Sequence, residues 1–445
     1  KTMIQTILHQ LWNQRKMNGW IFVELLIVSF FLATVIDPIF DITSNLLRPS
    51  GFEMDHRYVA NIKIIPQGSA DFLEEEAGDS IHTAHFRHIV RMLRDLAEVE
   101  SFCYAMQMSV PSGNSWWGGQ AMRDSSGFSQ KDYEKLPGYV HFQQFSFCKA
   151  DGSDLFHVYG MTDAIHGGAL QIADDPKGNK LYLSAYCARR LFGDENPIGQ
   201  TFYTGVNDGH EVAGVYDDVK YTESWQPYPM VTWVNAELEP SSWVSFFYPV
   251  VLRLKEGVNE EAFLRRFKAE VAPTLKVGNL YCDGLTSFRE LNAKRMARMG
   301  VTNKLRLQYA LGGFALLCIF LGMVGTFWIR SQARRQEIGV MRSMGASQGR
   351  ICRQFLSESW LLLTIAFVLT IPLLWHYFQL EGFYQVQQSG QMVPNPAYWQ
   401  NQPGTRFVIL MLLDYLLLLL ISLIGTYIPT RRAARVLPCE ALRDE

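Results

Sequence analysis

The chain has 445 residues, 41 basic and 43 acidic side chains, and a formal net charge of −2. Such a balance does not suit a nucleic-acid-binding protein, which needs a basic surface to meet phosphate, and no nucleic-acid partner is predicted. Hydrophobic residues make up 48% of the chain and gather in long runs, so local windows are more informative than the average.

Four apolar runs approach or reach the length of about 20 residues that crosses the hydrocarbon core of a bilayer. In chain order they are residues 20–36, 307–329, 355–377 and 407–428. The first contains Glu24 and the fourth contains Asp414. Because a carboxylate is costly in lipid, each acid is expected either to form a helix–helix hydrogen bond or to serve as a functional polar contact or proton site.

The distribution of Lys and Arg predicts the orientation, because cytoplasmic flanks are enriched in both. Segment 330–354 carries six of them, and segment 378–406 carries none before Arg406. Residues 1–19, 330–354 and 429–445 are therefore predicted to be cytoplasmic, and residues 37–306 and 378–406 extracytoplasmic. Asp37-Pro38, rather than a small-residue cleavage site, follows the first run, which favours an uncleaved anchor over a signal peptide.

The extracytoplasmic segment 37–306 alternates short strand-like and helix-like pieces, which predicts an α+β domain. Strands are expected at 58–65, 102–110, 140–149 and 156–161, and amphipathic helices at 84–97 and 261–271. The loop-like stretch 111–137 contains Trp116 and Trp117. These tryptophans are expected either to contact a hydrophobic substrate or the outer leaflet, or to anchor the loop by burial.

Four of the seven cysteines lie in the extracytoplasmic segment, where an oxidising compartment permits disulfides. Cys103 and Cys148 both fall on expected strands, and they are the first pair that we expect to be linked. Sequence alone does not choose among the three possible pairings of four cysteines.

The sequence gives little support for an enzyme. It lacks a Gly-x4-Gly-Lys-Ser/Thr phosphate loop, His-Glu-x-x-His and Cys-x-x-Cys. Residues 345–349 match Gly-x-Ser-x-Gly, but they lie in a basic segment between two apolar runs and not after a strand, where that motif acts. No catalytic residue, cofactor or metal ligand is therefore predicted in this chain.

Two cytoplasmic motifs stand next to the predicted spans. The first begins at Arg334 and reads RRQEIGVMRSMGAS; the second begins at Tyr427 and reads YIPTRRAAR, followed by Pro438 and by EALR from Glu440. Together they resemble the cytoplasmic signature of MacB/FtsX-type permeases, the membrane subunits of type VII, mechanotransmission ABC transporters. The stretch 181–202, with its Phe-Gly and Asn-Pro-x-Gly turns before the strand 210–217, is similar to the periplasmic core domain of the same permeases.

The resemblance implies a bacterial inner-membrane permease without a fused ATPase domain. It implies two copies of a separate ABC ATPase that binds the ATP and Mg, a second permease copy or a paralogue, membrane lipid, and a periplasmic or outer-membrane partner. It assigns coupling to the ATPase to a helix between the second and third spans. The residues expected in that role are Glu337, Ile338, Val340, Met341, Arg342, Met344 and Gly345.

Three functions remain open at this point. The first is ATP-driven export or extraction of an amphiphilic substrate. The second is FtsX-like mechanical activation of an extracytoplasmic partner without transport. The third, a membrane-anchored sensor or enzyme without an ATPase, is weakened by the cytoplasmic motif, which a sensor would not require.

Overall fold

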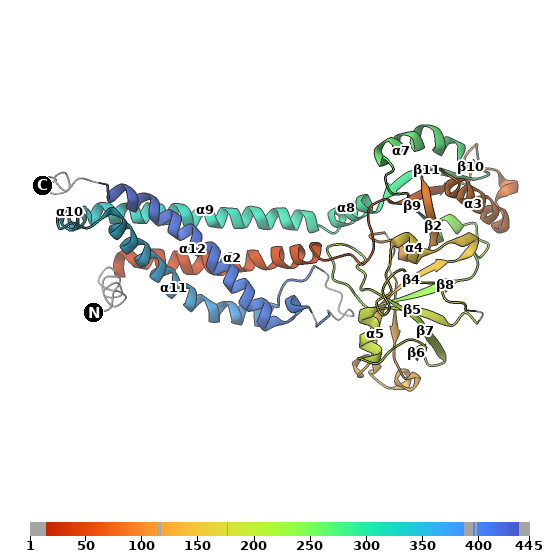
Figure 1. Cartoon of the computed structure of the whole chain (residues 1–445), viewed down its shortest axis with the longest axis horizontal. Coiled ribbons are helices and arrows are strands. Elements are labelled where there is room, and N and C mark those ends of the chain that lie inside the picture. Colours follow the sequence, from red (N-terminus) through yellow and green to blue (C-terminus); the bar gives the residue numbers. More distant parts are fainter. Residues whose placement is uncertain are drawn as a thin grey trace. The chain divides into compact units, whose positions relative to one another are not determined.

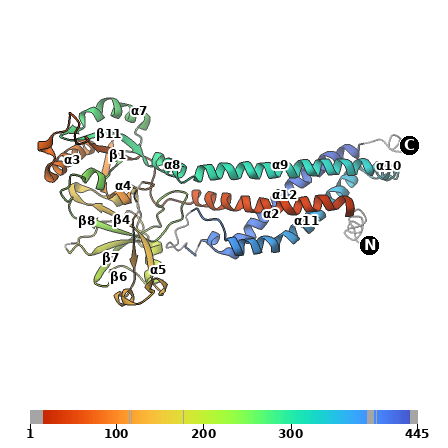
Figure 2. The same cartoon turned by 180° about the vertical axis from the view of Figure 1, so that it is seen from behind.

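The computed structural model describes residues 15–113, 115, 117–175, 177–386, 395–396 and 398–435 (Figures 1 and 2). Trp116 and the end of the second cytoplasmic motif, from residue 436 onward, lie outside these residues. The chain divides into two compact units, a helical unit built from residues 1–44, 302–386 and 396–445 and an α/β unit built from residues 45–301 and 387–395.

The helical unit contains four long helices that are apolar enough to cross a membrane, which confirms the four predicted spans. These are α2 (Arg15–Leu46), α9 (Val301–Ala333), α11 (Gln348–Glu381) and α12 (Pro403–Ala433). At 1.5 Å per residue each is more than 45 Å long, so each helix extends beyond a hydrocarbon core of about 30 Å. The short helix α10 (Arg335–Ser343) lies between α9 and α11.

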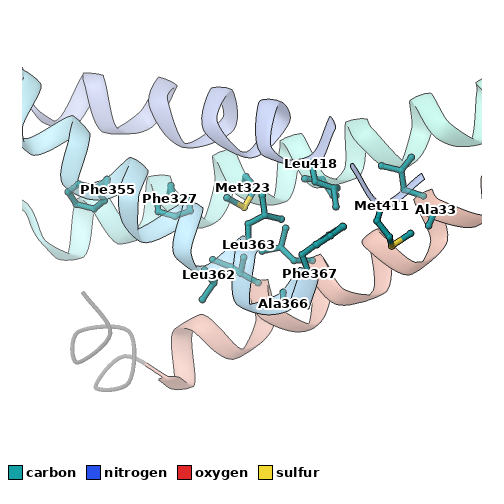
Figure 3. Packing of buried hydrophobic residues seen from close by; sticks show 14 of the residues in the cluster. Ala33, Met323, Phe327, Phe355, Leu362, Leu363, Ala366, Phe367, Met411 and Leu418 are labelled. Carbon is teal, nitrogen blue, oxygen red and sulfur yellow. The ribbon is translucent and has the colours of Figure 1, made fainter. Parts of the chain in front are cut away.

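The four long helices pack around an apolar core, shown in Figure 3. Leu363, Ala366 and Leu418 are fully buried there, and Phe355 and Phe327 continue the core toward α10. Other apolar side chains of the same helices point outward; a set on α9 comprises Phe314, Leu317, Leu321 and Ile329. Helices that are apolar on both faces are expected where the solvent is lipid.

The α/β unit is built on one mixed sheet, which confirms the predicted α+β class. The strands are β1 (Arg57–Ile64), β2 (Val99–Ala105), β3 (Gly118–Ala121), β4 (Val140–Cys148), β5 (Lys180–Ser184), β6 (Thr201–Gly205), β7 (Asp208–Tyr216), β8 (Met230–Asn235), β9 (Val250–Leu254), β10 (Lys276–Val277) and β11 (Leu280–Ser287). Their order is β10-β11-β1-β9-β2-β4-β8-β5-β7-β6, with β3 paired to β4. The pairs β4–β8 and β5–β7 are parallel, and the remaining pairs between these strands are antiparallel.

Helices connect and cover the strands of this sheet. They are α3 (Asp79–Arg94), α4 (Leu155–Tyr159), α5 (Ala185–Phe192), α6 (Val244–Phe247), α7 (Glu260–Arg266) and α8 (Phe288–Arg298). The apolar stripe of α3, with Phe86, Ile89 and Leu93, packs against β2 and β9 in one core cluster. Helix α5 packs on β5 and β7 in a second cluster and ends at Gly193, whose φ of +65° favours glycine.

A buried lysine fixes a turn of the α/β unit. Lys220 is fully buried, and its Nζ donates hydrogen bonds to the carbonyls of Asn45, Arg48 and Glu223 at 2.7, 2.7 and 3.2 Å. Burial lowers the pKa of Lys220 to about 8. The three carbonyls take the place of the water that an exposed ammonium would bind.

The strand predicted at 156–161 is wrong, because this stretch forms helix α4. The Asp154 carboxylate accepts a hydrogen bond from the backbone of His157 and so caps the helix start. Gly160, at φ +67°, ends it after five residues. Leu155, Phe156, Val158 and Tyr159 are all buried, and a short apolar run buried on most sides gives no reliable period in the sequence.

The predicted Cys103–Cys148 disulfide is also wrong, since both thiols are free and buried. In the antiparallel pair β2–β4, Tyr104 lies opposite Cys148. Successive side chains of a strand point to opposite faces, so Cys103 and Cys148 project from opposite faces of the sheet. Strand β4 lies where it was expected, whereas β2 begins three residues before the predicted 102–110 and ends five residues before its end, where residues 107–109 form a 3-10 turn. Both cysteines lie on strands, but a register offset of one residue separates the sulfurs.

Candidate functional site

Helix α10 is the element to which the sequence assigned coupling, and its C-terminal end is a well-defined turn. Gly345 has a φ of +86°, a conformation that favours glycine. Its N–H donates to the carbonyl of Arg342 at 3.1 Å, and the N–H of Ala346 donates to that of Met341 at 2.9 Å. This pair of bonds is a Schellman motif, and its usual apolar contact is supplied by Met341 and Ala346, which both pack on the helical core.

Helix α11 begins immediately after this turn. The Ser347 hydroxyl accepts a hydrogen bond from the backbone N–H of Arg350, which caps the new helix. Between the glycine and the cap there is one residue, Ala346. The direction of α11 relative to α10 is therefore set by a short connection whose backbone hydrogen bonds are satisfied.

The start of α10 is fixed by an arginine held between two carboxylates. Arg334 donates to both oxygens of Glu337 at 2.6 and 2.9 Å and to both oxygens of Glu358, on α11, at 3.0 and 3.1 Å. Its guanidinium also lies 4.8 Å from the centre of the Phe355 ring. The side chains of Arg334 and Glu358 are only 7% and 2% exposed. This contact joins α10 to α11 at the start of α10, about three turns before the Gly345 motif connects the same two helices at its other end.

The two carboxylates differ in environment although they share one arginine. The side chain of Glu337 is 47% exposed, whereas that of Glu358 is 2% exposed. The hydrogen bonds from Arg334 lower the pKa of Glu337. Glu337 thus lies at the surface of α10, while Glu358 forms the inner half of the contact.

The predicted coupling residues fall into two groups. Ile338 is buried in the helical core and Met341 is half-buried against it, so both act as packing residues of the permease itself. Val340 and Met344 are 47% and 82% exposed. Among the apolar residues predicted to meet a partner, these two offer the accessible surface. Arg342 is half-buried and Gly345 is exposed.

The intramembrane acids predicted from the sequence both meet neighbouring helices. Asp414 on α12 is fully buried and accepts a hydrogen bond from the Ser29 hydroxyl of α2 at 3.0 Å. Glu24 on α2 lies against α9 at Gly322, where an added Cβ would overlap the Glu24 carboxylate. Both acids therefore take part in helix–helix contacts.

A second buried cluster at the opposite end of the helical unit was not predicted. Arg406, at the start of α12, donates to Asp37 of α2 at 2.6 and 2.9 Å and to the carbonyl of Tyr384 at 2.8 Å, and lies 3.5 Å from Asp41. The carboxylates of Asp37 and Asp41 accept the backbone N–H groups of Tyr384 and Val386 at 2.7 and 3.0 Å. The cluster ties α2, α12 and the segment after α11 together.

Comparison with known proteins supports the resemblance seen in the sequence. Residues 309–438 match the FtsX-like permease C-terminal family, which covers α10, the Gly345 turn and α12. In this region the chain is similar to permeases of the MacB/FtsX type. The four membrane helices and this domain agree with a multi-pass protein of the inner membrane whose large α/β unit is periplasmic. The resemblance drawn from the two cytoplasmic motifs is thereby confirmed.

The curated relatives are similar to this chain at low identity. The macrolide export ATP-binding/permease protein MacB of Salmonella paratyphi A is 22% identical over 66% of this chain and 42% of the relative. MacB of Sodalis glossinidius is 28% identical over 36% of this chain and 23% of the relative. The chain thus spans less than half the length of the curated relatives it matches. Among solved structures, the periplasmic region of MacB from Actinobacillus actinomycetemcomitans aligns over 56% of this chain and 96% of that one, with 12% identity and a TM-score of 0.30.

Sequence reasoning found α10 and its glycine but missed the contact that positions the helix. Arg334 was placed at the start of the first cytoplasmic motif without a structural role, and Glu358 was not singled out. The available signal was Glu358 itself, an acid within an otherwise apolar span a few residues after a basic loop. An acid at such a place is expected to have a cationic partner nearby.

Proposed function

We propose that this permease is the membrane subunit of an ATP-driven transporter in which a separate ABC ATPase, present in two copies and binding ATP and Mg, docks on α10. A second permease copy or a paralogue completes the assembly, and a periplasmic or outer-membrane partner receives the substrate. The observation that carries the proposal is the exposed pair Val340 and Met344 on a helix that is fastened to α11 at both ends. An apolar helix face of this kind fits a groove on a partner.

The contacts of α10 indicate how a push is passed on. A force on Val340 and Met344 reaches α11 through the Arg334–Glu358 contact and through the hydrogen-bonded turn at Gly345. Helix α9 precedes α10 directly, with Arg334 as the cap between them. Because α9 and α11 are continuous helices of 33 and 34 residues, a displacement at α10 is expected to travel along them as a rigid-body motion.

The substrate class follows from the relatives and not from a pocket. The relatives are named as macrolide exporters, and a macrolide is a large amphiphile. We propose that the transporter exports an amphiphilic molecule or extracts it from the periplasmic side of the membrane. Stimulation of ATP hydrolysis by a macrolide, with the permease and its ATPase reconstituted together, tests this part. Stimulation by an extracytoplasmic partner protein alone would instead favour mechanical regulation.

The docking step is tested with charge substitutions on the exposed face. The double variant Val340→Glu/Met344→Glu is expected to lose association with the ATPase while the permease remains as stable as the wild type. Met341→Glu is expected to reduce stability as well, because Met341 packs on the core. Val206→Glu serves as the control, since Val206 is a comparably exposed apolar residue of the α/β unit. Unchanged ATPase association in the double variant would contradict docking at α10.

A further inference from the structure

A patch of exposed aromatic side chains lies on the α/β unit, apart from the elements considered so far. Trp243, Phe246 and Phe247 are 61%, 50% and 45% exposed. Their rings contact one another, with centroids 6.3 Å apart for Trp243–Phe246 and 5.5 Å apart for Phe246–Phe247. These three residues are called the aromatic patch below.

The patch is held in place from beneath. Val244 and Tyr248 of the same segment are buried in the core cluster that contains α3. The backbone N–H of Ser241 donates to the Thr83 hydroxyl at 3.0 Å, and that of Ser242 donates to the Asp79 carboxylate at 2.7 Å. The segment is thus anchored to α3, and its aromatic side chains are presented on a fixed backbone. Pre-organised aromatic side chains lose little entropy when they bind.

The surroundings of the aromatic patch are acidic. The segment that carries the patch, residues 235–248, contains Glu237 and Glu239 and no Lys or Arg. Asp79 touches the patch segment directly, and Glu237 and Glu239, both exposed, precede Trp243 by a few residues. Glu239 is close enough to Tyr248 that its charge contributes to raising the pKa of that phenol, after burial. An apolar centre with an acidic border selects against anionic surfaces.

This charge pattern narrows the choice of occupant. An anionic bilayer surface would be repelled by the acids. A second copy of the chain, meeting the patch about a two-fold axis, would place the same acids opposite one another. The exposed fractions of the three aromatic side chains correspond to roughly 300 Å² of apolar surface. A standard protein–protein interface buries about 800 Å² on each partner, so the patch is large enough to form the apolar centre of such an interface. Aromatic residues at such a centre carry much of the binding energy.

We infer that the aromatic patch is a docking site for a partner protein that presents a cationic amphipathic segment, with apolar side chains for the three rings and Lys or Arg for the acidic border. The rings also favour cations through their π faces. This inference rests on the patch alone, so its failure would leave the proposed docking at α10 unaffected.

The test uses the full chain in detergent and a fluorescent synthetic amphipathic helix of leucine and lysine as the probe. Fluorescence anisotropy is expected to show saturable binding that weakens with added salt. The triple variant Trp243→Ser/Phe246→Ser/Phe247→Ser is expected to bind about tenfold more weakly or worse, since truncation of such anchors is costly. A leucine–glutamate helix of the same pattern is expected not to bind.

Controls separate the patch from general charge and from folding. Glu237→Gln/Glu239→Gln is expected to weaken binding severalfold and to reduce its salt dependence, whereas Glu261→Gln/Glu270→Gln, an equal loss of charge at exposed sites elsewhere, leaves binding unchanged. The carboxamide pair tests the proposal even if the triple variant folds poorly. Equal binding of the probe to wild type and all variants overturns the inference, as does equal binding of the leucine–glutamate helix. A smaller assembly of the triple variant by light scattering would assign the patch to a second copy and would also overturn it.

Discussion

The Arg334–Glu358 contact makes a quantitative prediction, because Arg334 has two carboxylate partners in different environments. Glu358→Gln removes the buried charge while keeping the shape of the side chain. Glu337→Gln makes the same chemical change at a side chain that is 47% exposed. If burial decides the strength of the contact, the two substitutions should differ strongly although they act on the same guanidinium.

The expected magnitudes follow from the two environments. Removing one partner of a buried ion pair costs about 3–5 kcal/mol, since the other charge is left without compensation. Arg334 keeps Glu337 in the Glu358→Gln variant, so a loss near 3 kcal/mol is expected. An exposed ion pair contributes about 1 kcal/mol or less, and this is the upper bound for Glu337→Gln. Against a usual folding stability of about 5–15 kcal/mol, only the first change is large.

The measurement is unfolding of the purified permease in mixed micelles of a mild detergent and dodecyl sulfate, followed by near-ultraviolet circular dichroism. The double variant Arg334→Met/Glu358→Leu is the matched control, because replacing a whole buried pair by apolar groups of similar volume is often neutral or stabilising. It should therefore be more stable than Glu358→Gln. Equal losses for Glu358→Gln and Glu337→Gln would refute the argument that the inner carboxylate fixes α10 to α11.

Three further predictions concern other positions. Gly345→Ala should lower the stability of the permease by about 1–2 kcal/mol, because alanine tolerates the positive φ poorly, and it should lower stimulation of the ATPase. Gly345→Asn should retain more of that stimulation, since asparagine tolerates a positive φ better. The pKa of Lys220 is about 8 in the folded state, below its unfolded value, so the unfolded state binds more protons between pH 8 and about 10. The free energy of unfolding should therefore rise in this range by about 1.4 kcal/mol per pH unit relative to the Lys220→Met variant. A parallel pH dependence of the two proteins would contradict this. Peptide mapping without reduction should find Cys103 and Cys148 as free thiols that alkylate only on unfolding, because burial raises the pKa of both; a linked peptide would contradict the strand register.

The features that the sequence predicted well have a local physical cause. A long apolar run is a membrane helix almost regardless of its neighbours, so all four spans were found. Gly345 was found because a positive φ after a helix needs glycine and leaves a readable stop. The strands β1 and β4 were located to within one or two residues for the same reason, since β-branched and aromatic runs bounded by turns are local signals.

The features that were missed depend on residues distant in the chain. Asp37 and Arg406 are 369 positions apart, and no local pattern connects them. The disulfide between Cys103 and Cys148 failed because register is a property of two strands and not of either one. Ile338 and Met341 were assigned to a partner surface because the sequence of an amphipathic helix does not show whether its apolar face packs on another protein or on the same chain. Here much of that face packs on the membrane helices of the chain itself.

The polar contacts of the helical unit indicate which helices move together. In lipid, little hydrophobic force drives one helix against another, so packing and polar contacts set their positions. Helices α2 and α12 are joined at two depths, by Ser29 to Asp414 and by Asp37 to Arg406, and are expected to behave as one body. Helix α11 is joined to α10 by Arg334 and Glu358. It is also joined to α12, because Thr426 donates to Ser359 and Trp360 donates to the Tyr415 hydroxyl, so α10 and α11 belong to the same linked group.

Helix α9 approaches α2 at Gly312, beside Val35, and at Gly322, beside the Glu24 carboxylate, and it approaches α12 at Gly425, beside Met323 and Phe320. Such contacts slide more readily than buried ion pairs separate, so under the proposed mechanism a push on α10 is expected to shift α9 along the α2–α12 pair rather than to part that pair.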